Sequence, residues 1–125
     1  MKTYLCGPIA GKTDSECKDW RARATEVLVD VLDPMARDYR SGSDGKEAEI
    51  VEGDKRDIDA CGALLVWFPH PSVGTAMEVL YAWERGKVVV VVDVSGKPIS
   101  PWMVYHSTEI FKDLERALDY IRAAQ

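Results

Sequence analysis

The sequence predicts an α/β fold built on a parallel sheet, and three observations support this prediction. Short apolar runs at residues 63–68 and 88–92 have the length of buried strands. A helix-length segment separates them, which is the pattern of a parallel βαβ unit. With 125 residues, 46% of them hydrophobic, the chain has room for a single domain over residues 1–125 with a three-layer core. Ligands of open α/β sheets bind at the carboxyl edge of the strands, so we expect a site there.

The first strand is predicted at residues 2–6, and a loop with two glycines follows it. In such a loop the backbone can approach a ligand closely, and its N–H groups can point at an anion. Apolar residues at helical spacing then predict a helix over residues 14–30. Residues 29–32 lead into a second strand, which Asp33 and Pro34 end.

The loop at residues 35–47 allows two interpretations. Its glycine, serine and charged residues are typical of a solvated connection. The same loop could instead fold over a ligand, and the side chains that it would then present are Met35, Arg37, Tyr39 or Arg40.

A helix is predicted at residues 47–61, and a carboxylate lies on its packed face. The residues that share this face are Ile50, Val51, Asp54, Ile58 and Cys61. Burying an unpaired carboxylate is costly, so Asp54 needs an explanation. It either caps a neighbouring loop or faces the same cleft as a second acid, Glu78. Two carboxylates at one site can serve as a nucleophile and as an acid or base.

Glu78 lies on the helix between the two central strands, with Ser72 at the expected N-cap and Gly86 at the end. No lysine or arginine lies one turn away from it: the neighbours are Gly74, Thr75, Tyr81 and Ala82. A carboxylate among small and aromatic groups is partly desolvated, which makes Glu78 a candidate nucleophile or acid. The alternative is a half-exposed helix residue in contact with water.

The last part of the chain continues the same alternation. Residues 93–101 form another loop at the carboxyl edge, and residues 102–106 are predicted to be a short helical segment. A last strand is predicted at residues 109–111, followed by an amphipathic closing helix over residues 112–124.

Charge and cysteine content exclude several classes of function. The net charge is −5 and no basic run occurs, so we expect no nucleic-acid polymer and no acidic membrane as a partner. No apolar run is long enough for a signal peptide or a membrane span. The three cysteines lack CxxC spacing, which predicts free thiols in a reducing cytoplasm and no metal site.

Four segments match the motifs of a known family in the right order: YLCGPI, VEGDKRDIDACGALLVW, PSVGTAMEVLYAWERGKVVVVV and GKPIS. They resemble the nucleoside 2-deoxyribosyltransferase family, and most closely its 2′-deoxynucleoside 5′-monophosphate N-glycosidases. The resemblance implies a flavodoxin-like, Rossmann-like three-layer sandwich with a five-stranded parallel sheet. It also implies a homodimer or larger assembly with shared active sites, and a reaction without a metal or an organic cofactor.

The resemblance further implies roles for individual residues. Glu78 corresponds to the nucleophile that attacks C1′ of the sugar, Tyr4 to the tyrosine that orients this glutamate, and Asp54 to the aspartate that supports acid–base chemistry. The residues implied to bind the substrate are Gly7, Ile9, Ser72, Gly74 and Ser100. The implied reaction cleaves the N-glycosidic bond through a covalent 2-deoxyribosyl ester, which water or a second nucleobase then releases.

Two positions favour a 5′-monophosphate substrate. Where the nucleoside-using transferases carry an acid and an asparagine from the neighbouring subunit, this chain has Ser72 and Ser100, as the monophosphate N-glycosidases do. A hydroxyl at a helix N-terminus can donate to a phosphate, whereas a carboxylate repels it. One departure is Ala10, which stands where those N-glycosidases have an arginine. The missing charge could come from Lys12, Arg37 or Lys97.

Other functions stay open at this point. The chain could be a transferase that acts on unphosphorylated deoxynucleosides, or a nucleotide-binding module without turnover. Hydrolysis of NAD or of a ribonucleotide is a third possibility. Trp67 and Phe68 could sandwich the nucleobase, or belong to the core. The sequence does not separate hydrolysis from transfer, nor does it define the preferred base.

Overall fold

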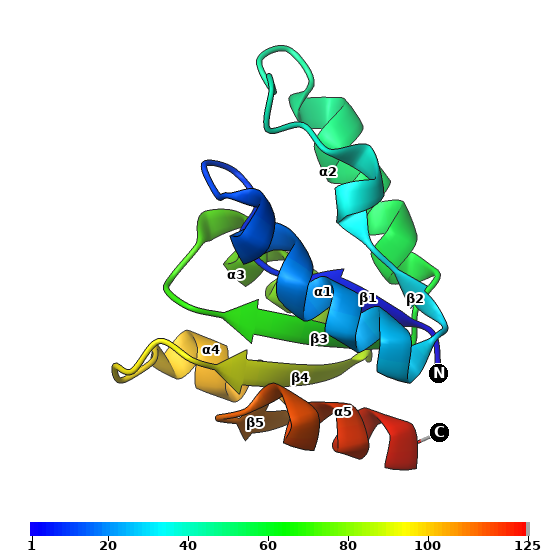
Figure 1. Ribbon diagram of the computed structural model, residues 1–125, viewed down its shortest axis with the longest axis vertical. Coiled ribbons are helices and arrows are strands. Elements are labelled where there is room, and N and C mark those ends of the chain that lie inside the picture. Colours follow the sequence, from blue (N-terminus) through cyan, green and yellow to red (C-terminus); the bar gives the residue numbers. More distant parts are fainter. Residues whose placement is uncertain (125) are drawn as a thin grey trace.

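The computed structural model describes residues 1–124, and Gln125 lies outside the described residues. It confirms the predicted α/β fold, with five parallel strands in the order β2-β1-β3-β4-β5. The flavodoxin-like class of open sheets has this order. Figure 1 shows β1, β3 and β4 side by side in one direction. The strands are β1 (Thr3–Cys6), β2 (Val31–Leu32), β3 (Ala63–Phe68), β4 (Val88–Asp93) and β5 (Glu109–Phe111).

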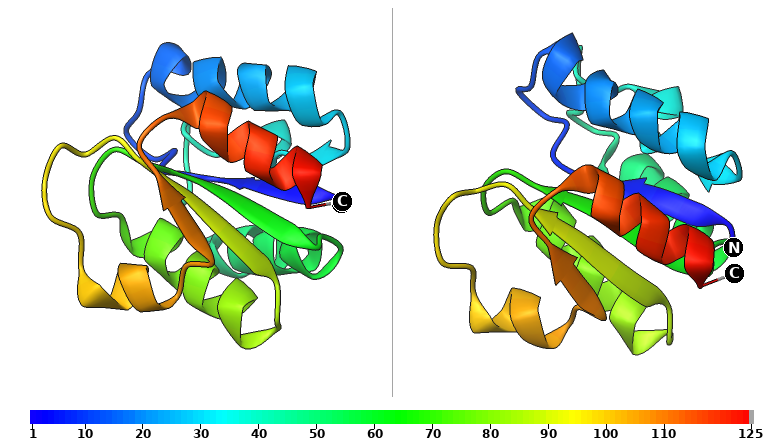
Figure 2. Two further views of the ribbon diagram at one scale, coloured as in Figure 1. Left: turned by 90° about the horizontal axis from the view of Figure 1, so that it is seen from below. Right: turned by 60° about the horizontal axis from the view of Figure 1, so that its bottom comes forward.

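Helices cover both faces of this sheet. Figure 2 shows α1 (blue) and α5 (red) on one face, with α3 (green) and α4 (orange) on the other. The α2 helix packs on the same face as α3, since its Ile58 belongs to the core beneath that helix. The helical segments are α1 (Asp14–Leu28), the 3-10 helix η1 (Pro34–Arg37), α2 (Glu47–Asp59), α3 (Val73–Glu84), α4 (Pro101–Tyr105) and α5 (Leu114–Ala123).

Two hydrophobic cores follow from the alternation of side chains along the strands. On β1, Tyr4 and Cys6 enter the core under α2, α3 and α4, whereas Leu5 enters the core under α1 and α5. Both faces of β3 and β4 are buried in the same way, which explains their uninterrupted apolar sequence. Tyr4 and Cys6 therefore face the helix that carries Glu78.

The sequence positions the ends of α1. Thr13 forms a capping box with Glu16: the Thr13 side chain accepts from the Glu16 amide, and the Glu16 side chain accepts from the Thr13 amide. The helix ends at Leu28, before the end of the predicted range, because Val29 has a positive φ of 66° and turns the chain towards β2. This turn brings β2 alongside β1 at the edge of the sheet.

One part of the predicted packing of α2 is wrong. Val51 was expected on the buried face, but it is 47% exposed. Gly53 is buried instead, because Arg37 of η1 lies against it. A Cβ atom at Gly53 would lie 3.2 Å from Nε of Arg37. The contact of α2 with η1 thus replaces part of the expected contact with the sheet.

Candidate active site

A cavity of about 510 Å³ opens at the carboxyl edge of β1 and β3. The chain order of the sheet reverses between these two strands, which is where ligands of open α/β sheets bind. The predicted site residues that line this cavity, named here the Glu78 cavity, are Gly7, Ile9, Asp54, Ser72, Gly74 and Glu78. Tyr4 is fully buried behind Glu78. The structure thus brings together every predicted site residue except Ser100.

Glu78 is partly buried, and two donors from β1 hold its carboxylate. The hydroxyl of Tyr4 donates to Oε2 at 2.5 Å, and the thiol of Cys6 donates to Oε1 at 3.5 Å. Tyr4 and Cys6 are two residues apart on one strand, so their side chains share a face. Glu78 has no lysine or arginine one turn away on its own helix, but it has two hydrogen-bond donors on β1, across the core.

This environment raises the pKa of Glu78 from 4.5 to about 7. Burial is the largest cause, the hydrogen bond from Tyr4 acts in the opposite direction, and the nearby charge of Asp54 raises the pKa further. Burial and the proximity of Glu78 also raise the pKa of Tyr4 and the pKa of Cys6. Both groups therefore keep their protons near neutral pH and act as donors, while Glu78 changes charge there.

The second acid, Asp54, is bound by a cation from η1. Nη2 of Arg37 lies 3.2 Å from Oδ1 of Asp54 and 2.8 Å from Oδ2 of Asp57. Burial raises the pKa of Asp54, and the hydrogen bond and charge of Arg37 oppose this rise. A carboxyl group with a raised pKa beside a cavity is suited to proton transfer.

A buried arginine holds the loop after β1 in place. Arg21 is 1% exposed and donates to the carbonyl oxygens of Cys17, at 2.9 Å, and Gly7, at 3.1 Å. Gly7 itself leaves no room for a side chain, because a Cβ atom there would lie 3.0 Å from the ring of Trp20. This first wall of the Glu78 cavity is therefore fixed by packing as well as by hydrogen bonds.

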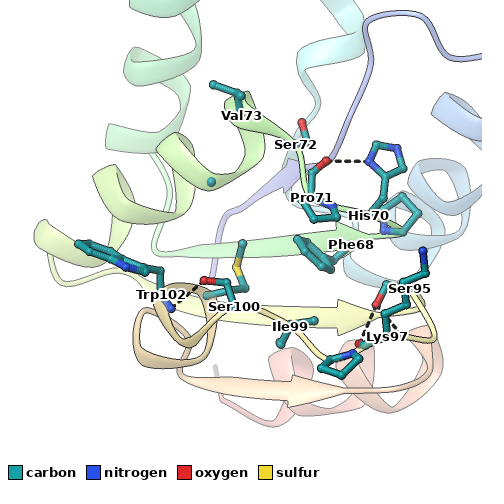
Figure 3. Close-up of a pocket in the computed structure, with 14 residues that line it drawn as sticks. Phe68, His70, Pro71, Ser72, Val73, Ser95, Lys97, Ile99, Ser100 and Trp102 are labelled. Atoms are coloured by element: carbon teal, nitrogen blue, oxygen red, sulfur yellow. Dashed lines mark hydrogen bonds between the residues drawn. The ribbon is translucent and has the colours of Figure 1, made fainter.

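Ser72 stands between the Glu78 cavity and a second cavity of about 470 Å³. It occupies the N-cap position of α3, as expected, but its side chain makes no capping hydrogen bond. Figure 3 shows the second cavity, with Ser72 on one side and Lys97, Ile99 and Ser100 on the other. The hydroxyl of Ser100 accepts from the amide of Trp102 at 3.1 Å and caps α4. Ser100 does not line the Glu78 cavity of its own chain.

The loop after β2 reaches the Glu78 cavity. Arg37, Tyr39 and Arg40 line it, and Met35 does not. Of the residues considered for the charge missing at Ala10, Arg37 lines this cavity, Lys97 lines the second cavity, and Lys12 lines neither.

Of the two roles left open for Trp67 and Phe68, the packing favours a place in the core. Trp67 stacks on Trp20, with ring centroids 5.7 Å apart, in the core on the other face of the sheet. Phe68 lines the second cavity, and neither ring lines the Glu78 cavity. Strand alternation decides this outcome, because consecutive residues of β3 point to opposite faces.

Two residues beside Glu78 are not indicated as site residues by the sequence patterns: Cys6, which donates to its carboxylate, and Thr75, which lines the Glu78 cavity. The cysteine spacing indicates only a free thiol at Cys6, although this residue follows Tyr4 at the strand period of two. The helical spacing indicates Thr75 only as a neighbour of Glu78, three residues before it, whereas the structure places Thr75 in the lining of the Glu78 cavity. The sequence shows both spacings, two residues on the strand and three on the helix. They indicate site residues only when it is known that Glu78 packs against β1.

Within residues 1–124, no cluster of three or more His, Cys, Asp or Glu side chains is placed to hold a metal ion. None of the helices in this part of the chain is long and apolar enough to cross a membrane. Cys6, Cys17 and Cys61 are buried and form no disulfide.

The fold and the cavity define a class of protein: an open parallel α/β protein with two carboxylates at the switch point of its sheet. A family model described as nucleoside 2-deoxyribosyltransferase matches residues 3–114. The chain therefore belongs to the nucleoside 2-deoxyribosyltransferase family. Members of this family act on small nucleoside or nucleotide substrates, and the match supports glycosyl transfer or cleavage. No curated protein matches the sequence.

Solved structures share the fold at low sequence identity. A 2-deoxyribosyltransferase from Bacillus psychrosaccharolyticus superposes with a TM-score of 0.78 at 20% identity, covering 96% of this chain and 92% of that chain. A CMP N-glycosidase from Clostridium botulinum superposes with a TM-score of 0.65 at 13% identity, covering 98% of this chain and 99% of that chain. A conserved protein from Enterococcus faecalis V583 superposes with a TM-score of 0.74 at 16% identity, covering 100% of this chain and 99% of that chain.

Proposed function

We propose that this protein cleaves the N-glycosidic bond of 2′-deoxynucleoside 5′-monophosphates through a covalent 2-deoxyribosyl ester of Glu78. The observation that carries the proposal is the hydrogen bond of 2.5 Å from Tyr4 to Glu78 in the wall of a cavity that also contains Asp54. The bond fixes the orientation of a carboxylate whose pKa, at about 7, is matched to neutral pH. The ion pairs found within residues 1–124 do not include Glu78, so its carboxylate is held by two hydrogen bonds from uncharged donors.

The reaction follows the double displacement of a retaining glycosidase. An oxygen of ionised Glu78 forms a bond to C1′ while the bond from C1′ to the base nitrogen breaks. Asp54, whose pKa is raised, delivers a proton to the departing base directly or through water. Water then attacks C1′ and regenerates Glu78, and Asp54 recovers its proton from that water. A second nucleobase in place of water gives transfer.

The start of α3 supports a phosphate at the 5′ end. Ser72 has no capping hydrogen bond, so its hydroxyl is available to donate. The N-terminal amides and the helix dipole favour an anion there. A Cβ atom at Gly74 would have no neighbour within 4 Å, so the backbone is open to close approach. Arg37 and Arg40 line the same cavity, but both are already paired with aspartates.

We further propose a homodimer in which α3 and α4 of two subunits meet. These helices expose a set of large apolar side chains, and together they form a surface suited to a second copy: Val73, Met77, Leu80, Trp102 and Tyr105. Ser100 begins α4 beside this surface, so the partner subunit would supply its own Ser100 to the phosphate. The three buried, unpaired thiols support a reducing cytoplasm as the location.

A substrate panel tests the reaction. The protein is incubated with 2′-deoxynucleosides, their 5′-monophosphates and ribonucleoside 5′-monophosphates, each with and without free adenine, and the bases are separated by chromatography. We expect free base from the deoxynucleoside monophosphates without adenine. Base exchange confined to unphosphorylated deoxynucleosides would identify a transferase instead. Binding without any released base would identify a nucleotide-binding module.

The Ser72→Asp variant tests the phosphate assignment. A carboxylate at this position repels a phosphate dianion, so kcat/KM for the monophosphate is expected to fall about 100-fold, from about 3 kcal/mol of repulsion and lost hydrogen bonding. The value for the unphosphorylated nucleoside is expected to change far less. Equal losses for both substrates would contradict the assignment, and Ser41→Asp, at an exposed serine that lines neither cavity, is the matched control.

A further inference from the structure

Thr75 carries a buried hydroxyl that has no hydrogen-bond partner within residues 1–124. The residue lies in the first turn of α3 and is 2% exposed, and its Oγ1 has no hydrogen-bond partner. Few other buried side-chain atoms within residues 1–124 share this condition: Trp20 Nε1, Arg21 Nε and Arg37 Nε. A buried polar group without a partner costs free energy, so each one needs an explanation.

The local alternative for this hydroxyl is not used. A threonine in a helix often donates to the carbonyl four residues earlier, which here belongs to Pro71. That carbonyl oxygen lies 2.8 Å from Nδ1 of His70 instead. Thr75 also lines the Glu78 cavity. The helix therefore leaves the hydroxyl free at the wall of a substrate cavity.

The position of Thr75 relates it to the substrate. Ser72, Thr75 and Glu78 follow one another at intervals of three residues, so they lie in one row along α3. With about 1.5 Å of rise per residue, Thr75 lies about 4.5 Å along the axis from each of the other two. It thus stands between the acid proposed to attack C1′ and the helix end proposed to meet the 5′-phosphate.

The stereochemistry of a β-nucleotide then selects one substrate atom. The base and the 5′ carbon project from one face of the sugar ring, and the 3′-hydroxyl projects from the other. A nucleophile that displaces the base attacks the face opposite to it, which is the face that carries the 3′-hydroxyl. With C1′ at Glu78 and the 5′-phosphate at Ser72, as in the proposed function, this hydroxyl would face the helix between the two residues, because C3′ is bonded to C4′, which bears the 5′ end.

We propose that Oγ1 of Thr75 hydrogen-bonds the 3′-hydroxyl of the substrate sugar and so positions C1′ over Glu78. The inference rests on the proposed function and extends it, because it makes a free 3′-hydroxyl a recognised part of the substrate. A threonine in a helix populates two χ1 rotamers, so rotation about one bond turns the hydroxyl to the cavity. Thr75 is then a substrate-binding residue, and its hydroxyl gains the hydrogen-bond partner that it lacks when the nucleotide binds.

The test pairs a variant with a substrate that lacks the same interaction. Thr75→Val keeps the shape and removes the hydroxyl, and a 2′,3′-dideoxynucleoside 5′-monophosphate lacks the 3′-hydroxyl. We expect Thr75→Val to lower kcat/KM about 10-fold for the 2′-deoxynucleotide and to leave the dideoxynucleotide unchanged. Thr75→Ser should retain the preference of the wild type. Equal losses on both substrates would overturn the proposal.

Matched controls separate this inference from the proposed function. Thr25→Val removes a hydroxyl that donates to the carbonyl of Arg21, outside the Glu78 cavity, and should leave the substrate preference unchanged. If the wild type released no base at all, the proposed function would fail. Dissociation constants of the two nucleotides in a Glu78→Gln background would then decide the role of Thr75, and an unchanged ratio on adding Thr75→Val would refute it.

A measurement without substrate completes the test. Because the hydroxyl of Thr75 has no partner in the described part of the chain, Thr75→Val should melt no lower than the wild type in the absence of nucleotide. A fall of several degrees would reveal a structural partner for this hydroxyl and overturn the proposal.

Discussion

Two opposing effects act on the carboxylate of Glu78: burial disfavours its ionised form, and two hydrogen bonds favour it. Desolvation raises its pKa to about 7, and this makes its ionised form costly for the folded protein. Tyr4 and Cys6 lower that cost by donating to the two carboxylate oxygens. At the scale of the residue, the site therefore holds a carboxylate whose ionised form is only partly stabilised.

The first prediction concerns stability. Because the folded-state pKa of Glu78 lies above its unfolded value of 4.5, the folded state holds the extra proton between pH 4.5 and about 7, and stability falls as the pH rises through this range. Glu78→Gln removes this penalty, so it should stabilise the protein at pH 8, by at most about 3 kcal/mol, and have little effect at pH 4. Urea denaturation at both pH values measures this, and greater stabilisation at pH 4 would contradict it. The same variant should release no base.

The second prediction concerns Cys6. Its hydrogen bond lowers the pKa of Glu78, so Cys6→Ala should raise that pKa and shift the acidic limb of the kcat/KM profile to higher pH. Cys6→Ser restores a donor and should restore the profile. Cys61→Ala removes another buried thiol without contact to Glu78 and serves as the control. An acidic limb that Cys6→Ala leaves in place would exclude this role.

At the scale of elements, the pairing of η1 with α2 builds one wall of the cavity. Arg37 from η1 lies between two aspartates of α2 and against Gly53, which has no side chain to block it. The 3-10 helix itself starts with Pro34 behind an Asp33 N-cap, whose side chain accepts from the amide of Met35. A short helix of four residues thus determines the charge around the second acid.

The third prediction tests this pairing. Arg37→Ala leaves Asp54 and Asp57 without their shared cation, so the folded protein should lose about 1 kcal/mol of stability at pH 7, a modest value because all three side chains are partly exposed. Adding Asp57→Asn to Arg37→Ala removes the repulsion between the carboxylates of Asp54 and Asp57, and it should recover part of the lost stability. Thermal denaturation of the single and double variants measures both effects. A double variant less stable than Arg37→Ala would contradict the pairing.

At the scale of the whole molecule, the face formed by α3 and α4 exposes several large apolar side chains close together. Met77 is 67% exposed, Trp102 is 73% exposed and Tyr105 is 70% exposed, and all three lie on α3 or α4. Ser100 lies next to this face and away from Glu78. In the proposed homodimer, a second subunit would cover the apolar side chains and add its Ser100 to the proposed phosphate site.

The fourth prediction tests the assembly. Met77→Asp places a charge in the proposed interface, so sedimentation should show a shift from dimer to monomer, together with a loss of monophosphate turnover. Val51→Asp changes an exposed apolar residue on α2, away from that face, and should leave both properties unchanged. A monomeric Met77→Asp variant with full turnover would show that the partner contributes nothing to the site.

Several features followed from the sequence alone. Apolar runs of strand length and helical periodicity are local patterns, so they predicted the α/β class and the order of the elements. The family motifs named Tyr4, Asp54 and Glu78 as a candidate set. The periodicity failed at Val51, because it cannot tell where the neighbours of a helix end. Figure 1 shows the first turns of α2 extending beyond the sheet.

Tertiary structure alone decided how these residues meet. The bond from Tyr4 to Glu78 joins positions 74 residues apart, and it depends on how α3 lies across β1. The same packing placed Cys6 against Glu78, Arg37 between two acids, and Ser100 outside the Glu78 cavity. Local patterns determine which element a residue joins, whereas the burial and partners of a side chain arise only when distant elements pack together.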